Sequence, residues 1–432
     1  MRLEDTRTGE LRELRPGPDG AIRIYVCGPT VYDRIHVGNA RPVVVFLQMK
    51  RYLEWRGQPV RLVQNITDIN DKIYAAARRR GVRSDDLAAQ MTRAFIEDTD
   101  RLGLGRPDVE PLASETIPEI VALIEELIAA GNAYEAQGDV YFAVRSFDRY
   151  GQLSKQRPDE VEAGARVEPG EHKRDPIDFA LWKAAKPDED TSWPSPWGAG
   201  RPAWHIECSA MAEKLLGRDF EVHGGGLDLV FPHHENEIAQ SCSIGRGFAH
   251  VWAHNGMLEL RGDKMSKSEG NIEGLAEALD RWGAETFIMY LLQAHYRSPI
   301  EYSDRALLQA RESCATLRNR LRAGEGGKDD SVRAAVCDAL DDDFATPRAM
   351  ALLFDGAASA PDTVAEVLGI LGLGGLAHEE EAPADVVDLA ERRVAARRGR
   401  DFAESDRLRA EIAELGWEVR DTAEGYRLYR RG

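Results

Sequence analysis

The stretch IRIYVCGPTVYDRIHVGNARPVVVFLQMKRYLEW, residues 22–55, decides the fold. It opens with a β-branched run, residues 22–26, which predicts a strand that ends at Cys27. Residues 42–55 are predicted to form a helix, and residues 60–66 a second strand. A strand, a helix and a strand in this order form a β-α-β unit, the building block of sheets with parallel strands.

Two phosphate-binding signals lie at the start of this helix and far downstream. The tetrapeptide HVGN, residues 36–39, places an imidazole just before the helix, whose first amides and dipole attract phosphate. Four-residue matches also arise by chance, whereas KMSKS at residues 264–268 is more specific and adds Lys264 and Lys267 on a predicted loop. Because positioned cations and N–H donors stabilise the charge that spreads over a reacting phosphate, His36 and Lys267 suit that task.

The alternation of strands and helices stops at about residue 85 and resumes after residue 202, so residues 85–200 are predicted to be an insertion. The resumed pattern predicts a helix at 205–216, a strand at 220–223, a flexible glycine loop at 224–226, a helix at 233–244 and a strand at 251–253. Two β-α-β halves separated by an insertion predict an α/β protein with a split doubly wound, Rossmann-type domain.

Beyond residue 270 the chain is predicted to be mostly helical. One apolar helix face is indicated by residues that recur at intervals of three and four: Leu307, Ala310, Cys314, Leu317 and Leu321. After an acidic linker, two helices and a hairpin are predicted to form a small module. The expected units are two half-domains at 1–84 and 201–260, the insertion at 85–200, a loop-and-stem region at 261–315, a helical bundle at 316–378 and the C-terminal module at 379–432.

Composition places the chain among soluble globular proteins. It has 432 residues, 30% of them charged, and a net charge of −18. No apolar run approaches the ~18 residues needed to span a bilayer, and residues 1–14 do not resemble a secretory signal. We therefore expect a cytoplasmic protein without membrane contact. The acidic balance argues against indiscriminate nucleic-acid binding but does not exclude a local basic patch.

The five cysteines form an odd and sparse set, which argues against a disulfide framework and leaves metal binding or burial. Cys314 and Cys337 fall in apolar helical patterns, and Cys242 follows the histidine-rich helix. Since free cysteine behaves as a small hydrophobic residue, burial is the prediction for all three.

The other two cysteines are candidate metal ligands, together with a histidine and a glutamate. His233 and Glu237 lie one helical turn apart, which suits two ligands of one metal and equally suits a hydrogen-bonded pair. With Cys27 and Cys208 they offer two thiolates, an imidazole and a carboxylate, an acceptable set for zinc. The spacing is not that of a zinc finger or ribbon. Two further histidines compete as ligands: His223 and His234.

Five longer stretches resemble one known family closely. They are YVCGPTVYDRIHVGNAR, NITDINDKI, WPSPWGAGRPAWHIECSAM, VHGGGLDLVFPHHENEIAQS and GDKMSKSEGN. Weaker similarity runs through HYRSPIEYS, LDDDFATPRAM and the C-terminal module. On these residues the chain resembles the class I aminoacyl-tRNA synthetases, and specifically the cysteinyl-tRNA synthetase family, over essentially its whole length.

The resemblance implies a cysteine–tRNA ligase that activates L-cysteine with ATP and transfers it to tRNA(Cys), with one Zn²⁺ per chain, Mg²⁺ with ATP and an anticodon-binding C-terminal module. The implied zinc ligands are Cys27, Cys208, His233 and Glu237. The implied catalytic and ATP-binding residues are His36, Gly38, Asn39, Gly224, Gly225, Gly226, Lys264 and Lys267. The implied amino-acid pocket is lined by Thr67, Trp204 and Asp228. We expect a monomer.

The chain departs from the commonest family pattern at two asparagines. Asn39 stands where histidine is frequent, and because asparagine can still donate a hydrogen bond to a phosphate, we expect activity to be retained. Asn70 stands where aspartate is common. A second interpretation of Trp204 makes it an ordinary core aromatic. Three residues of the C-terminal module are candidate RNA contacts, although hairpin packing explains them equally well: Trp417, Tyr426 and Arg427.

Three alternative functions have to be weighed. The nearest is a cysteine ligase of mycothiol synthesis, which shares the fold but joins cysteine to an amino sugar. The resemblance implies that this enzyme lacks both the glutamate at position 237 and the C-terminal module. A catalytically silent tRNA-binding protein is disfavoured by the intact His36, Lys267 and metal ligands. A nucleotidyltransferase with a similar phosphate site is disfavoured by the C-terminal module.

Overall fold

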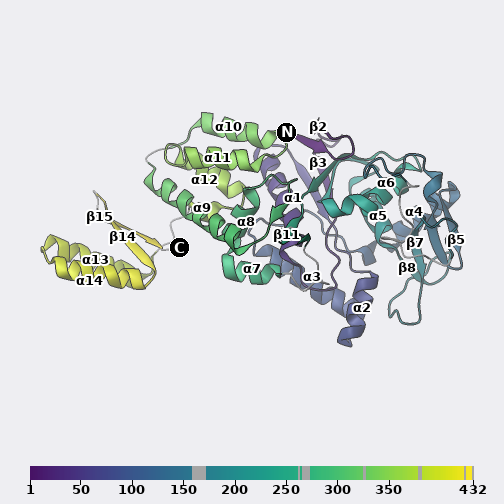
Figure 1. Ribbon diagram of the computed structural model, residues 1–432, viewed down its shortest axis with the longest axis horizontal. Coiled ribbons are helices and arrows are strands. Elements are labelled where there is room, and N and C mark those ends of the chain that lie inside the picture. Colours follow the sequence, from purple (N-terminus) through teal and green to yellow (C-terminus); the bar gives the residue numbers. More distant parts are fainter. Residues whose placement is uncertain are drawn as a thin grey trace.

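A four-stranded parallel sheet lies at the centre of the computed structural model, as Figure 1 shows. The structure describes residues 1–157, 172–260, 263–264, 273–324, 327–377, 382–422 and 425–430. The strands, in spatial order, are β10 (Phe248–Asn255), β9 (Asp219–Gly226), β3 (Ile22–Val26) and β4 (Val60–Gln64). The two halves of the chain meet where β3 pairs with β9. The split doubly wound sheet is therefore confirmed, and the β3–β9 seam is the point at which the strand order reverses, where such sheets bind ligands.

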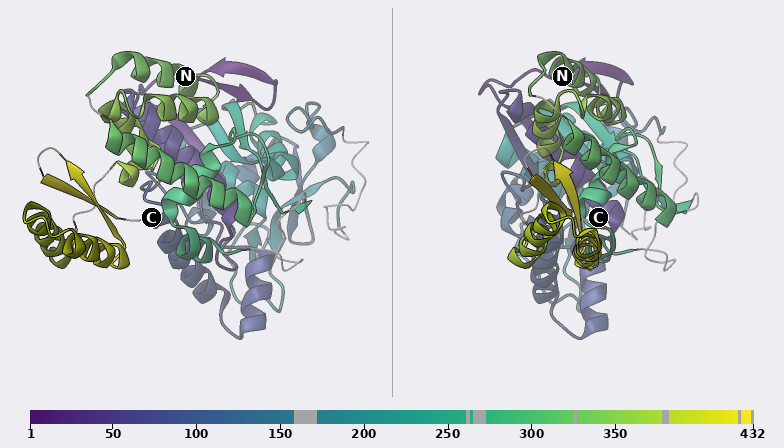
Figure 2. Two further views of the ribbon diagram at one scale, coloured as in Figure 1. Left: turned by 60° about the vertical axis from the view of Figure 1, so that its left-hand side comes forward. Right: turned by 90° about the vertical axis from the view of Figure 1, so that its left-hand side faces the viewer.

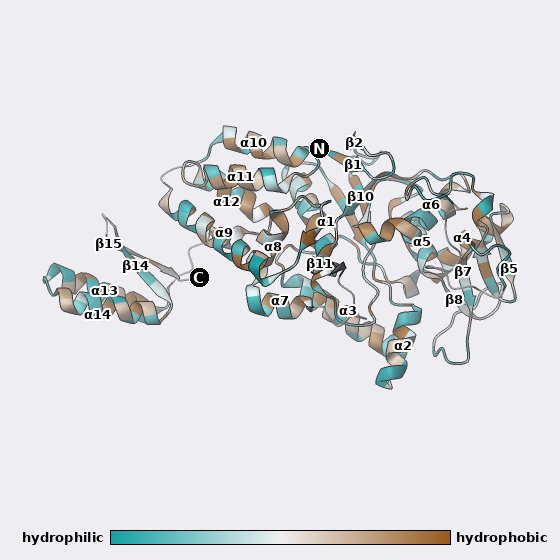
Figure 3. Ribbon diagram, in the orientation of Figure 1, coloured by the Kyte–Doolittle hydropathy of each residue, from teal (hydrophilic) through white to brown (hydrophobic). Residues whose placement is uncertain are grey.

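Helix α1 (Val37–Trp55) connects β3 to β4 and begins at HVGN, five residues before the predicted start. The imidazole Nδ1 of His36 accepts the Gly38 amide at 3.1 Å, and Asn39 Oδ1 accepts the His36 amide at 3.3 Å. This reciprocal capping fixes the start of the helix at the edge of the seam. Figure 3 shows hydrophobic residues gathered around α1, in agreement with the burial of most of its length.

Two predictions for the second half of the sheet are wrong in detail. Gly224–Gly226 were predicted as a flexible loop, but they continue β9 and are buried. The reason is packing, because a Cβ on Gly224 would lie 2.2 Å from the ring of Phe46 in α1, so only glycine lets the strand pass so close. The helix predicted at 233–244 is shorter. Helix α6 (Glu235–Cys242) follows a π turn, η5 (Val230–His234), and another helix, α5 (Trp204–Leu216), precedes β9.

Helix α2 (Asp71–Arg80) precedes the predicted insertion, which begins with helices α3 (Ser84–Asp100) and α4 (Ile117–Ala129). An antiparallel sheet follows, with strands β5 (Ala133–Ala136), β6 (Asp139–Phe142), β7 (Phe179–Ala184) and β8 (Gly200–Pro202) in that spatial order. Asn70 caps α2 through its Oδ1, which accepts the Lys72 amide at 3.1 Å. Because asparagine and aspartate cap helices about equally well, the departure at Asn70 keeps this local role.

The chain after the sheet forms short strands and a helical bundle. The strands are β11 (Leu258–Leu260), β12 (Asp263–Lys264) and β13 (Ile300–Glu301). The helices are α7 (Leu275–Trp282), α8 (Ala284–Leu292), α9 (Asp304–Ala323), α10 (Asp330–Asp341), α11 (Thr346–Gly356) and α12 (Pro361–Ile370). The predicted unit boundary between residues 315 and 316 falls inside α9, whose buried face runs without a break from Leu307 to Leu321.

Each end of the described chain contains a two-stranded antiparallel hairpin. The N-terminal hairpin, β1 (Arg2–Asp5) and β2 (Glu10–Glu13), contacts the edge strand β10. The C-terminal module has the predicted two helices, α13 (Ala384–Arg398) and α14 (Phe402–Glu414), and the hairpin β14 (Trp417–Thr422) and β15 (Gly425–Arg430). It has its own hydrophobic core and stands apart from the body in Figure 2. None of the helices in the described part of the chain is long and apolar enough to cross a membrane.

Burial of the non-ligand cysteines agrees with two of the three predictions. Cys314 and Cys337 are buried in the helical region. Cys242 is only half-buried, because it is the last residue of α6 and the chain turns toward the surface there. The prediction that Cys242 is buried is therefore wrong.

Candidate metal centre and active-site cleft

The four predicted metal ligands converge at the seam between β3 and β9. Cys27 follows β3, Cys208 lies in α5, His233 lies in the π turn and Glu237 lies in α6. The Sγ atoms of Cys27 and Cys208 are 3.6 Å apart, although 181 positions separate them in the sequence. Glu237 Oε1 lies 3.6 Å from Cys27 Sγ and 3.1 Å from His233 Nε2. All four side chains are buried, so the cluster is a closed donor set within the core.

The geometry of these donors fits a tetrahedral ion. Two thiolates at about 2.3 Å from one zinc ion would be about 3.8 Å apart, close to the observed sulfur separation. The Nε2 atom of His233 is buried and lies 3.1 Å from Glu237 Oε1 without the geometry of a hydrogen bond, whereas its Nδ1 lies 2.9 Å from His205 Nδ1. A histidine held through one nitrogen with the other directed at a carboxylate and two thiols is arranged as a metal ligand. The four donors are therefore arranged to hold one metal ion.

Burial controls the protonation of these groups. Desolvation raises the pKa of Cys27 well above its usual value and also raises the pKa of Cys208. Desolvation lowers the pKa of His233 well below its usual value, and lowers that of His205 to about 3. The imidazoles are therefore neutral at pH 7 and have a lone pair available. A cation between the thiols would favour their thiolate forms, since a nearby positive charge stabilises the ionised thiol.

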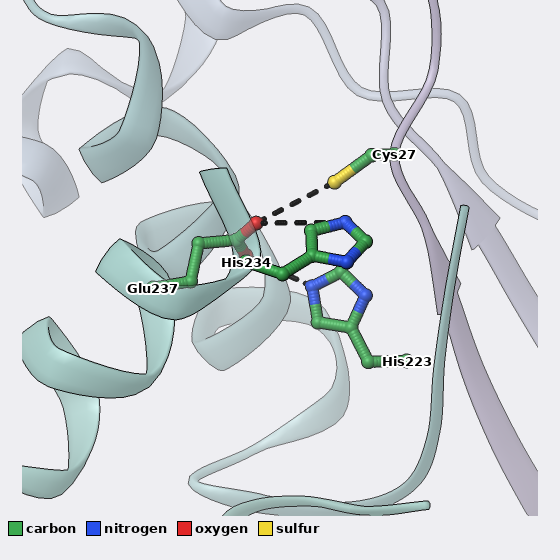
Figure 4. A group of neighbouring side chains, drawn as sticks. All are labelled: Cys27, His223, His234 and Glu237. Carbon is green, nitrogen blue, oxygen red and sulfur yellow. Dashed lines mark hydrogen bonds and ion pairs between the residues drawn. The ribbon is translucent and has the colours of Figure 1, made fainter. Parts of the chain in front are cut away.

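The competing histidines, His223 and His234, also face the carboxylate of Glu237, as Figure 4 shows together with Cys27. His223 Nε2 is 2.9 Å from Glu237 Oε2, and His234 Nε2 is 4.0 Å from Glu237 Oε1. Together with Cys27 they form a second possible donor set. Both sets share Cys27 and Glu237, so they describe one ion position with alternative neighbours. The set that includes both cysteines has the softer donors, which zinc accepts readily.

A cleft of about 250 Å³ opens beside this cluster. Seven of the predicted site residues line it: Cys27, His36, Gly38, Asn39, Trp204, Gly226 and Asp228. Cys27 belongs to both the cleft and the donor set, so a molecule in the cleft can reach a metal bound there. Trp204 is half-buried and its ring stacks on His233 with the centroids 4.1 Å apart. The interpretation of Trp204 as a core aromatic is therefore wrong.

The remaining predicted residues lie around the cleft or outside the described residues. Thr67 is buried behind the cleft, and its amide donates to the carbonyl of Pro29, a lining residue. Gly224 packs on Phe46, and Gly225 lies against His234 and Leu229. Only the backbone of Lys264 is described, in β12, and Lys267 lies outside the described residues.

Sequence reasoning missed several residues that complete the site. Tyr32 and Lys72 line the cleft, and each belongs to one of the long matching stretches quoted above. His205, which supports His233, lies in the matching stretch WHIECS beside Trp204. His254 supports His234 at 2.7 Å from a strand that no motif marked. Tyr32, Lys72 and His205 could have been found from their positions within the matching stretches. His254 could be found only from the structure, which brings its strand beside His234.

Comparison with known proteins agrees with this site. Residues 13–312 match the family model described as tRNA synthetases class I (C) catalytic domain. The cysteine–tRNA ligase of Halorhodospira halophila is 46% identical, and the alignment covers 98% of each chain. That of Rubrobacter xylanophilus is 44% identical over the full length of both chains. The chain belongs to the cysteine–tRNA ligase family of class I synthetases.

Solved structures of class I synthetases share the fold of this cysteine–tRNA ligase family member. Methionyl-tRNA synthetase of Mycobacterium tuberculosis, in complex with methionyl-adenylate, superposes with a TM-score of 0.60 at 16% identity, covering 82% of this chain and 90% of that one. A putative arginyl-tRNA synthetase from Campylobacter jejuni gives 0.55 at 12% identity, covering 84% of this chain and 92% of that one. At these identities the comparison establishes the fold alone, and the donor set and the cleft both lie within the residues that the family model matches.

Proposed function

We propose that this protein activates L-cysteine with ATP and transfers it to the 3′ end of tRNA(Cys). The observation that carries the proposal is the buried set of two thiols, an imidazole and a carboxylate that opens, through Cys27, on a cleft lined by the first turn of α1. The similarity to cysteine–tRNA ligases over the whole chain supports the same activity.

The donor set would hold one Zn²⁺ ion through Cys27, Cys208, His233 and Glu237. Serine and cysteine differ by one atom, and a simple pocket separates such near-isosteres by only ~10–200-fold. A bound zinc ion would supply a soft Lewis acid that accepts a thiolate sulfur far better than an alcohol oxygen. The chain itself would keep water away from the ion and orient the donor set toward the cleft. The stacking of Trp204 on His233 supports this orientation. Discrimination against serine would then need no editing site.

ATP would lie along the first turn of α1. The N-terminus of the helix and the capping pair His36 and Asn39 border the cleft, where the amides and polar side chains would bind phosphate oxygens of ATP carried with its Mg²⁺. Gly38 keeps the backbone accessible there. Lys267, with Lys264 nearby in the sequence, would stabilise the charge that develops as the cysteine carboxylate attacks the α-phosphate and pyrophosphate departs.

The amino acid would lie between the donor set and the phosphate site. Trp204 and Asp228 line the cleft and would hold the side chain and the amino group of cysteine, while Thr67 supports the wall formed by Pro29. Gly226 lines the cleft and would contact the adenosine directly. Gly224 and Gly225 would support the adenosine site indirectly, by letting β9 pass close to α1 and to His234.

The C-terminal module would bind the anticodon loop of tRNA(Cys), whose unstacked bases are available for recognition. Trp417 packs in the core of the module, so it supports the hairpin and is a poor candidate for base stacking. Tyr426 is half-buried on β15 and remains a candidate, as does Arg427, whose side chain lies outside the described residues. We also propose that the protein acts as a monomer in the cytoplasm, and size-exclusion chromatography would test the monomer.

Two assays on the purified, zinc-loaded protein test the activity. Cysteine-dependent exchange of pyrophosphate into ATP is expected, with serine giving more than ~200-fold less exchange, which exceeds what a simple pocket achieves. Charging of tRNA(Cys) is expected, whereas an amino sugar offered as acceptor should stay unmodified. No exchange would indicate a catalytically silent protein, and ligation to the amino sugar would favour the mycothiol-type ligase.

A further inference from the structure

A buried arginine joins two segments that line the ATP cleft. Arg41 lies in α1 between the cleft-lining residues Asn39 and Pro42, and its side chain is 1% exposed. One guanidinium nitrogen donates to the carbonyls of Gly256 at 2.6 Å and Met257 at 3.1 Å. Gly256 and Met257 belong to the other lining segment, residues 255–258. Arg41 therefore fixes the separation between the first turn of α1 and this segment.

The second guanidinium nitrogen holds the turn behind that segment. It donates to the carbonyls of His295 at 3.1 Å and Ser298 at 2.7 Å. The turn also fits closely against Gly256, where a Cβ would lie 2.3 Å from the Ser298 carbonyl oxygen. The sequence HYRS at 295–298, to which the proposed function assigns no role, thus forms the outer support of the cleft segment.

Acceptors of Arg41 are all backbone carbonyls, which is unusual for a buried cation. No carboxylate among the described residues forms an ion pair with it, and burial lowers the pKa of Arg41 to about 10. Burying a cation is costly unless its hydrogen bonds are satisfied, and the planar guanidinium can satisfy several carbonyls at fixed angles as an ammonium cannot. The arrangement selects arginine specifically.

An aspartate anchors the same turn from the helical bundle. Asp343 accepts hydrogen bonds from Arg297 Nε at 2.7 Å, from the Tyr296 hydroxyl at 3.0 Å and from the Glu4 amide at 2.9 Å. Asp343 and the next residue, Phe344, both have positive φ angles, 57° and 49°, which non-glycine residues rarely adopt. The three hydrogen bonds to Asp343 hold this strained turn in place. LDDDF, the second motif without an assigned role, thus supports HYRS.

We propose that Arg41 is a positioning residue for ATP, which sets the width of the cleft through the carbonyls of Gly256 and Met257, with Asp343 holding the turn behind them. This inference rests on the proposed function for the identity of the nucleotide, and on the hydrogen bonds for the role of Arg41. Arg41 does not line the cleft and so is not assigned a contact with the substrate.

Arg41→Lys tests the proposal, with Arg51→Lys as a matched control. Arg51 lies on the same helix and also donates to backbone carbonyls, those of Gly369, Ile370 and Leu104, far from the cleft-lining residues. In cysteine-dependent pyrophosphate exchange, Arg41→Lys should raise the KM for ATP by about tenfold or more while the KM for cysteine stays within about twofold. Arg51→Lys should leave both KM values within about twofold.

Direct binding of ATP, measured by calorimetry without cysteine, separates this inference from the proposed function. Weaker ATP binding by Arg41→Lys alone supports the inference even if the unaltered chain shows no cysteine-dependent exchange. The inference is overturned if Arg41→Lys binds ATP normally, or if Arg51→Lys weakens binding equally. Should Arg41→Lys fail to fold, Asp343→Asn takes its place, with an expected loss of ATP affinity of about two- to fivefold, and an unchanged affinity again overturns the inference.

Discussion

Cys27 and Cys208 come from opposite halves of the sheet, yet their sulfur atoms lie 3.6 Å apart in the core. Burial keeps both thiols protonated in the absence of a cation, because desolvation raises the pKa of each. The same burial keeps the imidazole of His233 neutral. A dry pocket with two thiols, a neutral imidazole and a carboxylate suits a divalent ion, which ionises the thiols as it binds.

Replacing Cys208 with serine should abolish stable zinc binding. The hydroxyl is a much weaker zinc ligand than a thiolate, so we expect the zinc content of purified Cys208→Ser to fall from about one ion per chain to a small fraction. Metal analysis by mass spectrometry measures it. Cys242→Ser is the matched control, since Cys242 ends α6 half-buried and outside the donor set, and should retain its zinc. Full zinc in Cys208→Ser would rule out this ligand.

At the scale of elements, local patterns were predictable and long-range fits were not. The spacing of apolar residues at intervals of three and four predicted the buried face of α9, which is confirmed. The one-turn spacing of His233 and Glu237 predicted that their side chains lie together, which is also confirmed. The glycines of β9 were misassigned because glycine has low strand propensity. Their close neighbours in the fold, such as Phe46 beside Gly224 and His234 beside Gly225, became visible only in the structure. The hydrogen bonds from Arg41 reach carbonyls more than two hundred positions away in the sequence, and neither periodicity nor composition predicts them.

Gly224→Ala should destabilise the fold by about 1–3 kcal/mol, because the new methyl group would press on the ring of Phe46 and force β9 away from α1. Chemical denaturation followed by circular dichroism measures the free energy of unfolding. Gly369→Ala is the control, since Gly369 lies in α12 with no atom within 4 Å of an added Cβ, and alanine favours helix. Equal stability of the Gly224 variant and the unaltered protein would contradict the packing described here.

The donor set and the cleft lie in a different part of the molecule from the C-terminal module. The donor set and cleft lie at the seam of the central sheet, whereas α13, α14 and their hairpin form a distinct core at one end of the molecule (Figure 1). The sequence predicted two helices and a hairpin for this C-terminal module, and the structure has α13, α14, β14 and β15 there. The placement of Arg393 under the hairpin, where it binds Asp421 at 2.8 Å, became visible only in the structure.

Removing residues 378–432 should separate the two proposed half-reactions. The module contributes no residue to the described cleft or donor set, so cysteine-dependent pyrophosphate exchange should stay within about twofold. Charging of tRNA(Cys) should fall by about tenfold or more, because contacts to the anticodon loop are lost. Undiminished charging by the shortened chain would show that the module does not bind the tRNA.

X-ray absorption at the zinc edge tests the central claim, that a metal ion in the donor set recognises the thiol of the substrate. The spectrum of the zinc-loaded protein should show two sulfur neighbours at about 2.3 Å, and addition of L-cysteine should add a third, whereas L-serine should change nothing. A coordination shell that stays the same after cysteine is added at saturating concentration would contradict the claim.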